Sequence, residues 1–207
     1  MGKAFVAWML VASAVAAPGP GPREVVEAAV SRVVATIQRI EIDTDAPQAH
    51  ARLRQQRRLE LRRVASALFD FEEIARRALS RHWAGRSPDE QAEFTRLFTE
   101  LLERTYLGRI ESYAGEKIVY LNEVVDGSFA TVRSKVVTRR RMETPLDYQL
   151  HLREGRWKVY DVLIDHVSFV STYRSEFARI IQRESYDALV ERLHKRNVDA
   201  AALVRMR

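Results

Sequence analysis

The sequence predicts an α+β fold in which helices precede and follow a four-stranded antiparallel sheet. Three observations predict it. Apolar residues recur at three- and four-residue steps over residues 23–112, the period changes to two over residues 117–164, and the helical period returns from Phe169 onward. Runs of helices and strands that do not alternate are typical of α+β architecture. A chain of 207 residues is long enough for one domain with a sizeable core.

The first residues have the pattern of a cleaved secretory signal peptide. Lys3 precedes an apolar run, Ala4–Val15, that is too short to span a bilayer, and Ala14-Val15-Ala16 fits the small-x-small pattern of a signal-peptidase site. We therefore expect a signal peptide over residues 1–17, a linker over 18–22, a single domain over 23–197 and a flexible tail over 198–207.

Capping residues mark the helix starts in the first half of the chain. A helix is expected from near Pro22, and an arginine-rich helix before Asp70, which has the spacing of a capping box with Glu73. The clearest start is Ser87-Pro88-Asp89-Glu90, because serine suits the cap, proline the first helical position and glutamate the third. This helix is expected to run to about Ser112. Its apolar stripe comprises Phe94, Leu97, Phe98, Leu101, Leu102, Tyr106 and Ile110.

Four strands are expected at residues 117–125, 129–139, 145–153 and 156–164. Asp126-Gly127 and Glu154-Gly155 are typical of hairpin turns between them. The third strand alternates apolar and polar residues and should have one dry face. The fourth is apolar on both sides, so both of its faces should be covered. Its two sides are expected to be Trp157, Val159 and Leu163 on one, and Tyr160, Val162 and Ile164 on the other.

The segment GRWKVYDVLIDHVSFVSTYRSEF (155–177) resembles the signature of the MlaC family. These are periplasmic phospholipid-binding proteins of Gram-negative bacteria, also called the toluene-tolerance family. The likeness extends upstream through residues 69–110 and downstream to residues 185–193. The resemblance implies a curved, nuclear-transport-factor-like sheet, packed with N-terminal and C-terminal helices around an apolar cavity. The family usually has glycine where this chain has His166, so the turn after the fourth strand is expected to differ.

The resemblance also implies a function. We expect a soluble periplasmic carrier that shuttles phospholipid between an inner-membrane lipid ABC transporter complex and an outer-membrane lipoprotein complex. Phospholipid would be its cargo, and no cofactor is expected. Exposing one acyl chain to water costs on the order of 12 kcal/mol, at about 0.8 kcal/mol for each methylene, so such a carrier needs a dry site. We expect a monomer that binds no nucleic acid.

The acyl chains are expected to lie between the sheet and the neighbouring helices. The choice of residues follows from inward parity on the strands or from position at the far end of the long helix, where the apolar stripe is either plain core or the wall of a cavity. The expected lining residues are Tyr106, Ile110, Val132, Val136, Tyr148, Leu150, Tyr160, Val162, Ile164 and Val167.

Positive charge is concentrated in two places. The net charge is +6, with six arginines between Arg52 and Arg63 and three more at Arg139, Arg140 and Arg141. Either cluster can be an ordinary solvated surface, or it can attract an acidic partner or anionic lipid headgroups. Nucleic acid is a poorer fit, because the clusters are not interleaved with stacking aromatic residues. We expect Arg139, Arg140 and Arg141 to dock the carrier onto its membrane-bound partner.

Little in the sequence points to catalysis. The chain has no cysteine, which excludes disulfides and thiol nucleophiles, and its five histidines lack metal-ligand spacing. We therefore expect no catalytic residue and no metal site. The alternative is an enzyme of nuclear-transport-factor-like fold that acts on a hydrophobic substrate, with Asp161 and His166 as an acid–base pair. Against it stands the plainer interpretation that Asp161 binds backbone or an arginine and that Asp165 caps the following helix.

Overall fold

The computed structural model describes residues 19–38 and 47–195. The expected signal peptide at 1–17, the first residue of the linker and the tail at 198–207 lie outside the described residues. The helices are α1 (Pro22–Gln38), α2 (Pro47–Leu68), α3 (Phe71–Leu79), the short 3₁₀ helix η1 (Ser80–His82), α4 (Pro88–Glu111), α5 (Phe169–Arg183) and α6 (Tyr186–His194). The strands are β1 (Lys117–Asp126), β2 (Phe129–Val137), β3 (Glu143–Arg153), β4 (Arg156–Ile164) and β5 (Val167–Ser168).

The strands form one antiparallel sheet in the order β1-β2-β3-β4-β5. The predicted α+β class and the four long strands are confirmed, but the predicted number of strands is wrong, because β5 adds a fifth. Asp165 and His166 have positive φ angles of 50° and 65°, and the chain turns back so that Ile164 pairs with Val167. Two central residues with positive φ form a type I′ turn, the tight turn that suits a twisted hairpin.

Replacing His166 by glycine is expected to stabilise the protein. A side chain with a Cβ atom is strained in the left-handed region, by about 1–2 kcal/mol, whereas glycine is not. Because glycine costs more backbone entropy, we expect His166→Gly to raise the free energy of unfolding by about 0.5–1 kcal/mol, or the melting temperature by a few degrees. Thermal unfolding measures this. His166→Ala keeps the Cβ and should bring no gain; an equal gain would assign the effect to the imidazole instead.

A β-bulge in β4 changes which residues share a face of the sheet. Gln149 pairs with Asp161 but the next residue, Leu150, pairs with Val159, so Tyr160 is the extra residue. The predicted division of this strand is therefore wrong. Trp157 and Val159 share their face with Val162 and Ile164, whereas Tyr160 lies on the opposite face with Leu163.

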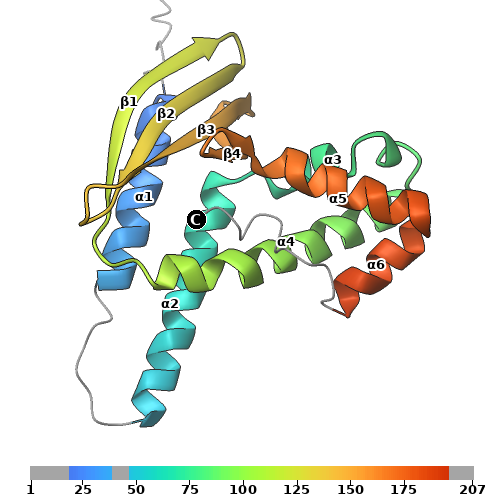
Figure 1. The fold of residues 1–207 in the computed structure, drawn as a ribbon, viewed down its shortest axis with the longest axis horizontal. Helices are drawn as coiled ribbons and strands as arrows, with labels where there is room; N and C mark the ends of the chain where they lie inside the picture. Colours follow the sequence, from blue (N-terminus) through green and yellow to red (C-terminus); the bar gives the residue numbers. More distant parts are fainter. Residues whose placement is uncertain (1–18, 39–46, 196–207) are drawn as a thin grey trace, which may run out of the picture.

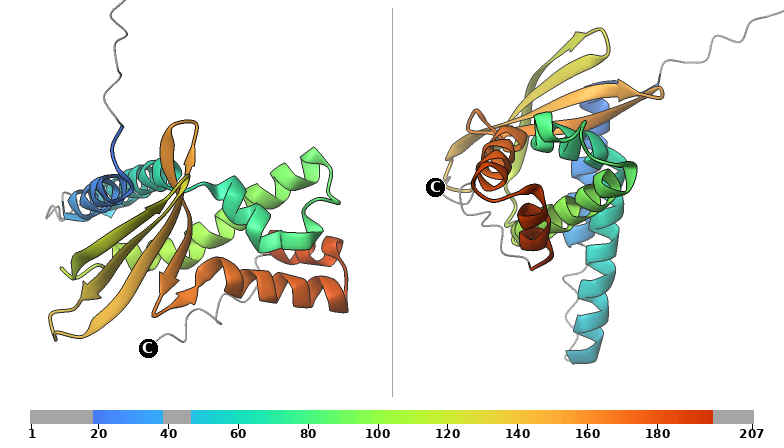
Figure 2. Two further views of the ribbon diagram at one scale, coloured as in Figure 1. Left: turned by 90° about the horizontal axis from the view of Figure 1, so that it is seen from above. Right: turned by 90° about the vertical axis from the view of Figure 1, so that its right-hand side faces the viewer.

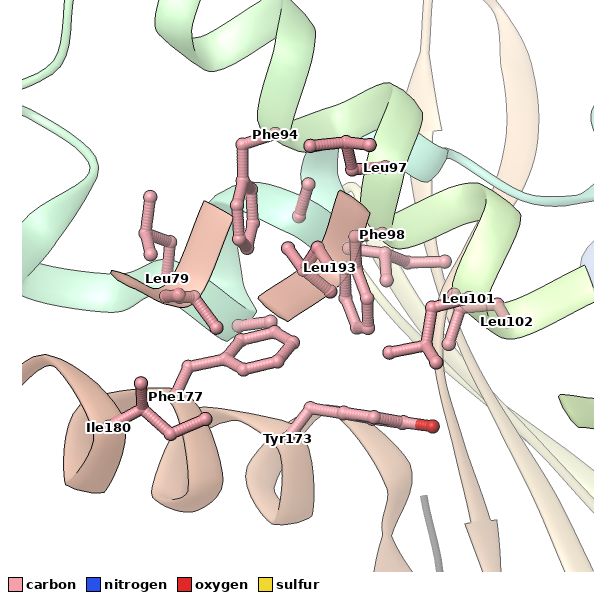
Figure 3. Close-up of a cluster of buried hydrophobic side chains, with 14 of the residues drawn as sticks. Leu79, Phe94, Leu97, Phe98, Leu101, Leu102, Tyr173, Phe177, Ile180 and Leu193 are labelled. Atoms are coloured by element: carbon pink, nitrogen blue, oxygen red, sulfur yellow. The ribbon is translucent and has the colours of Figure 1, made fainter. Parts of the chain in front are cut away.

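The buried residues form two clusters. Figures 1 and 2 show the elements that they join, with α1 and α2 beside the sheet and α3, α4, α5 and α6 grouped in a bundle. The sheet core joins α1 and α2 to the sheet through Val26, Leu68, Ala130, Val132, Tyr148, Leu150 and Val159. The bundle core lies among α3, α4, α5 and α6, and Figure 3 shows its aromatic centre, where Phe94 and Phe98 each contact Phe177 edge-on. Phe69 packs against both clusters and so links the sheet to the bundle.

Two helix starts were predicted from capping residues. At α4 the capping box is confirmed: the Glu90 amide donates to Ser87 Oγ at 3.3 Å, and the Ser87 amide donates to Glu90 Oε2 at 2.7 Å. At α3 the Asp70 cap is confirmed, because the Glu73 amide donates to Asp70 Oδ1 at 3.1 Å. The side chain of Glu73 instead pairs with Arg76 and Arg77.

Asp70 also ties the start of α3 to the sheet. Its buried carboxylate accepts hydrogen bonds from Arg153 Nη1 at 2.8 Å and contacts His151 Nε2 at 3.0 Å, both on β3. Burial raises the pKa of Asp70, but the hydrogen bonds from Arg153, the Glu73 amide and His151 outweigh it and hold the pKa below its ordinary value. Among the described residues, no helix is long and apolar enough to cross a membrane.

Candidate functional site

Seven of the predicted lining residues share one face of the sheet, which we call the inner face. The strand register places Val132 beside Tyr148 and Tyr148 beside Val162, and Leu150 and Ile164 belong to neighbouring rows of the same face. Val136 follows on β2, opposite Thr144. Period-two alternation on three paired strands accounts for this convergence.

The residues of the inner face differ in how deeply they are buried. Val132 and Leu150 are fully buried beneath α1 and α2, where they contact the sheet core. Val136, Val162 and Ile164 are only half-buried. The first two therefore belong to the closed core of the protein, whereas the other three keep part of their apolar surface exposed.

Val167 also belongs to this face, because it pairs with Ile164, whereas the other three predicted residues lie away from it. Tyr160 lies on the opposite face, where the Arg77 guanidinium carbon is 3.9 Å from the centre of its ring. Ile110 near the end of α4 is 39% exposed, and Val167 on β5 is 46% exposed. Tyr106 is half-buried in α4, with its ring edge-on to Phe169 at 5.2 Å between centroids. Only Tyr106 of these four packs against a core cluster.

Three tyrosine hydroxyls are buried without a hydrogen-bond partner in the described part of the chain: those of Tyr106, Tyr120 and Tyr173. Burial raises the pKa of Tyr120 to about 12 and raises those of Tyr106 and Tyr173 as well. Sequence reasoning did not single out the hydroxyls of Tyr120 and Tyr173. The helical spacing of Tyr173 with Phe169 and Phe177 predicts only a core position, and nothing local indicates an unpaired hydroxyl.

Two surface hollows lie beside α5 and on the outer face of the sheet. One, beside α5, is lined by Val167, Ser168, Ser171, Thr172, Ser175, Glu176 and Arg179. The other, on the outer face of the sheet, is lined by Leu121, Arg133, Ser134, Lys135, Glu143, Pro145, Asp147 and His166. Of the ten predicted lining residues, only Val167 borders either hollow. Most of the residues that line the two hollows are of polar types.

Asp161 has a structural role that leaves little capacity for acid–base chemistry. Its Oδ1 accepts from the Val162 and Val170 amides at 2.8 and 3.0 Å, and its Oδ2 accepts from Ser168 Oγ at 2.5 Å. The interpretation that Asp161 binds backbone is confirmed. The predicted cap of α5 by Asp165 is wrong, because Ser168 Oγ accepts from the Ser171 amide instead. His166 is exposed on the β4–β5 turn.

The two arginine clusters differ in their surroundings. Arg139, Arg140 and Arg141 are exposed in the turn between β2 and β3. In the other cluster, Arg57 and Arg58 of α2 lie 3.5 and 3.3 Å from Glu111 of α4, and Arg62 lies 2.9 Å from Glu103. Part of the second cluster therefore joins two helices. Within residues 19–38 and 47–195, no group of three or more acidic or histidine side chains is placed to hold a metal ion.

Comparison with known proteins gives consistent matches. The model of the family described as MlaC protein matches residues 34–195. The intermembrane phospholipid transport system binding protein MlaC of Haemophilus influenzae is 22% identical over 131 residues, which is 61% of this chain and 61% of that protein. The toluene tolerance protein ttg2D of Pseudomonas putida is 25% identical over 129 residues, 61% of this chain and 60% of that protein. The chain thus matches about three fifths of the length of these curated relatives.

One solved structure is similar over its whole length. It is a phospholipid-binding protein from Ralstonia solanacearum, in complex with a phospholipid. The TM-score is 0.72 and the sequence identity 27%, and the match covers 90% of this chain and 100% of the other.

Proposed function

The chain belongs to the MlaC family, and from this premise we propose that it is a soluble periplasmic phospholipid carrier. It would shuttle lipid between an inner-membrane lipid ABC transporter complex and an outer-membrane lipoprotein complex. One observation supports this most strongly. The fold matches the full length of a protein that was solved with a phospholipid bound, at 27% sequence identity.

The inner face supplies suitable chemistry for acyl chains. Val136, Val162 and Ile164 present half-buried apolar surface beside the closed sheet core. Burial of apolar surface stabilises a complex by roughly 25 cal/mol for each Å² removed from water. An acyl chain that lies on this surface would therefore bind favourably. Such binding needs no reactive group, and transfer between membranes requires only that loading and unloading be nearly balanced.

The enzyme alternative lacks support. The curated relatives are named as binding and tolerance proteins rather than as enzymes. The Asp161 carboxylate is occupied by two amides and a hydroxyl, so it would have to give up structural hydrogen bonds to act as a base.

A vesicle assay tests carrier function. Donor vesicles that contain deuterated phosphatidylethanolamine are separated from acceptor vesicles by a membrane that passes the protein but not vesicles. We expect catalytic amounts of the mature chain to move deuterated lipid into the acceptors, and heat-unfolded chain to move none. Equal transfer with and without the folded protein would reject the proposal.

The lipid headgroup is expected to remain at the surface, where the protein recognises it only weakly. Val136, Val162 and Ile164 are apolar, and these three residues offer no polar cluster that would distinguish one headgroup from another. In competition binding, phosphatidylethanolamine and phosphatidylglycerol of identical chains should differ by less than about tenfold, which corresponds to 1.4 kcal/mol. A larger preference for either lipid would contradict this expectation.

Reversing the charge of Arg139, Arg140 and Arg141 to glutamate is expected to slow lipid transfer without emptying the protein. We propose that these exposed side chains steer the carrier toward an acidic partner or an anionic bilayer. Exposed charges act mainly on the rate of encounter, and salt screens them over about 8–10 Å. Transfer by the wild type should also slow at raised salt.

A matched control is available on the helical bundle. Reversing Arg81, Arg174 and Arg183, which are also exposed, changes the net charge equally at a different site. We expect this variant to transfer lipid at close to the wild-type rate. If both triple variants slow transfer equally, net charge rather than docking at the β2–β3 turn is responsible.

A further inference from the structure

Strand β1 forms one edge of the sheet and carries exposed apolar side chains. Among the described residues its one neighbour in the sheet is β2, and Figure 1 shows β1 at the end of the sheet that lies away from the bundle. Its exposed large apolar residues, between 39% and 56% exposed, are Val119, Leu121, Val124 and Val125. An edge strand presents unpaired backbone groups, and with apolar side chains it is a template on which another strand can pair.

A β-bulge at Leu121 divides β1 into two halves. Tyr120 and Asn122 pair with adjacent residues of β2, so Leu121 is the extra residue. In a regular strand, residues share a face of the sheet when they are an even number of positions apart. Across this bulge, residues an odd number of positions apart share a face instead. Ile118 and Val125, for example, both lie on the inner face.

Because of this bulge, β1 is complementary to a second copy of itself that runs in the opposite direction. Directly opposite residues of an antiparallel pair must lie on the same face. When Lys117 of one copy is opposite Asp126 of the other, the pairs that share a face are Lys117 with Asp126, Ile118 with Val125, Val119 with Val124, and Tyr120 with Glu123. Leu121 and Asn122 then meet at the two-fold axis.

Other registers fit less well. A shift by one residue would place side chains of the inner face opposite side chains of the outer face. A shift by two residues would keep the faces but would place Lys117 or Asp126 opposite a valine. Both charged residues are exposed at the two ends of β1. The sequence, the bulge and the charges therefore select one register.

We propose that β1 pairs in this register with β1 of a second copy of this chain, to form a two-fold symmetric dimer with one continuous sheet. Each end of the interface carries a Lys117–Asp126 pair, and the aliphatic pairs lie between them. The two-fold axis is perpendicular to the sheet, so the inner faces of both copies lie on the same side. This inference differs from the monomer expected from the sequence, and it does not depend on the proposed function.

The contact of one strand with another is small compared with the interfaces of stable dimers. We expect a dissociation constant of about 0.1–1 mM, so the mature chain should change from monomer to dimer between about 20 µM and about 1 mM. Sedimentation velocity over this range measures the change. A second readout is amide hydrogen exchange, in which amides of β1 should become protected at the higher concentration.

Charge reversal tests the register. Lys117→Asp places two carboxylates together at each end of the interface, and Asp126→Lys places two ammonium groups there. Each variant alone should dimerise about tenfold or more weakly than the wild type. When the two variants are mixed, opposite charges meet again at both ends, so the mixture should form a dimer about as well as the wild type. Arg183→Asp on α5 is the matched control: it makes the same charge change as Lys117→Asp at another exposed position and should dimerise normally.

Three results would overturn the proposal. The first is a wild-type chain that stays monomeric up to about 1 mM, the upper end of the expected range of dissociation constants. The second is a dimer that Lys117→Asp does not weaken, or in which β1 gains no protection, because the copies would then meet elsewhere. The third is a failure of the mixed variants to recover dimerisation, which would reject the register. Each of these results would leave the carrier proposal intact, since lipid transfer between vesicles tests that proposal separately.

Discussion

Val162→Trp is expected to expel phospholipid from the protein while the fold survives. Val162 is half-buried on the inner face and adjoins the fully packed row of Val132 and Tyr148. An indole at this position would occupy the space proposed for an acyl chain. Overpacking costs about 1–3 kcal/mol, so lipid affinity should fall by about tenfold or more. Phosphate analysis of the purified variant measures the lipid retained, and circular dichroism checks the fold.

Leu163→Trp is the matched control. Leu163 is the next residue of β4 and is also half-buried, but it pairs with Asp147 on the outer face. The Leu163→Trp variant should therefore retain its bound lipid. Equal loss from both variants would show that tryptophan disturbs the strand in general, and full occupancy of Val162→Trp would show that the chain lies elsewhere. Leu150 is unsuitable for this test because it is fully buried in the sheet core.

Asp70→Ala is expected to cause the largest loss of stability, about 2–3 kcal/mol. It removes the cap of α3 and leaves Arg153 and His151 of β3 without their buried partner. The loss combines about 1 kcal/mol for the helix cap with about 1–2 kcal/mol for the hydrogen bonds to the buried carboxylate. The Arg153 side chain is 45% exposed, so water can solvate it in the variant. Urea unfolding measures the change. Glu72→Ala is the control: Glu72 also binds Arg153, at 2.9 Å, but it is exposed, and such pairs contribute about 0–1 kcal/mol.

The contribution of Asp70 should depend on pH with a defined sign. Its folded-state pKa is lowered from the ordinary value of 3.8, so the carboxylate binds protons less readily in the folded protein than in the unfolded one. The stabilisation is therefore complete above about pH 4–5 and is lost as pH falls through the folded-state pKa. The difference between wild type and Asp70→Ala should shrink in acid. A difference that stays constant down to pH 2 would show that the charge of Asp70 is not responsible.

Local patterns predicted most of the fold. The Ser87–Glu90 capping box and the Asp126-Gly127 hairpin are short-range signals, and the structure has the expected elements at both places. The fifth strand was missed because two residues are too few to show a period. The bulge at Tyr160 was missed because one inserted residue leaves no mark in a strand that is apolar on both sides.

The candidate site was predicted less completely. Parity along the strands placed Val132, Tyr148 and Val162 on one face, but parity cannot say that α1 and α2 close over Val132 and leave Val162 half-covered. That difference depends on tertiary packing. The same holds for the Tyr173 hydroxyl, whose lack of a partner is a property of the assembled bundle, and for Asp70, whose partner Arg153 is 83 residues away.

The most direct test of lipid binding is mass spectrometry of an organic extract of the purified mature protein, with the phospholipid quantified against protein. The account predicts phospholipid in stoichiometric amounts, and uptake of phospholipid from vesicles by protein that has been delipidated. A chain that purifies without phospholipid, stays folded, and takes up none from vesicles would contradict it.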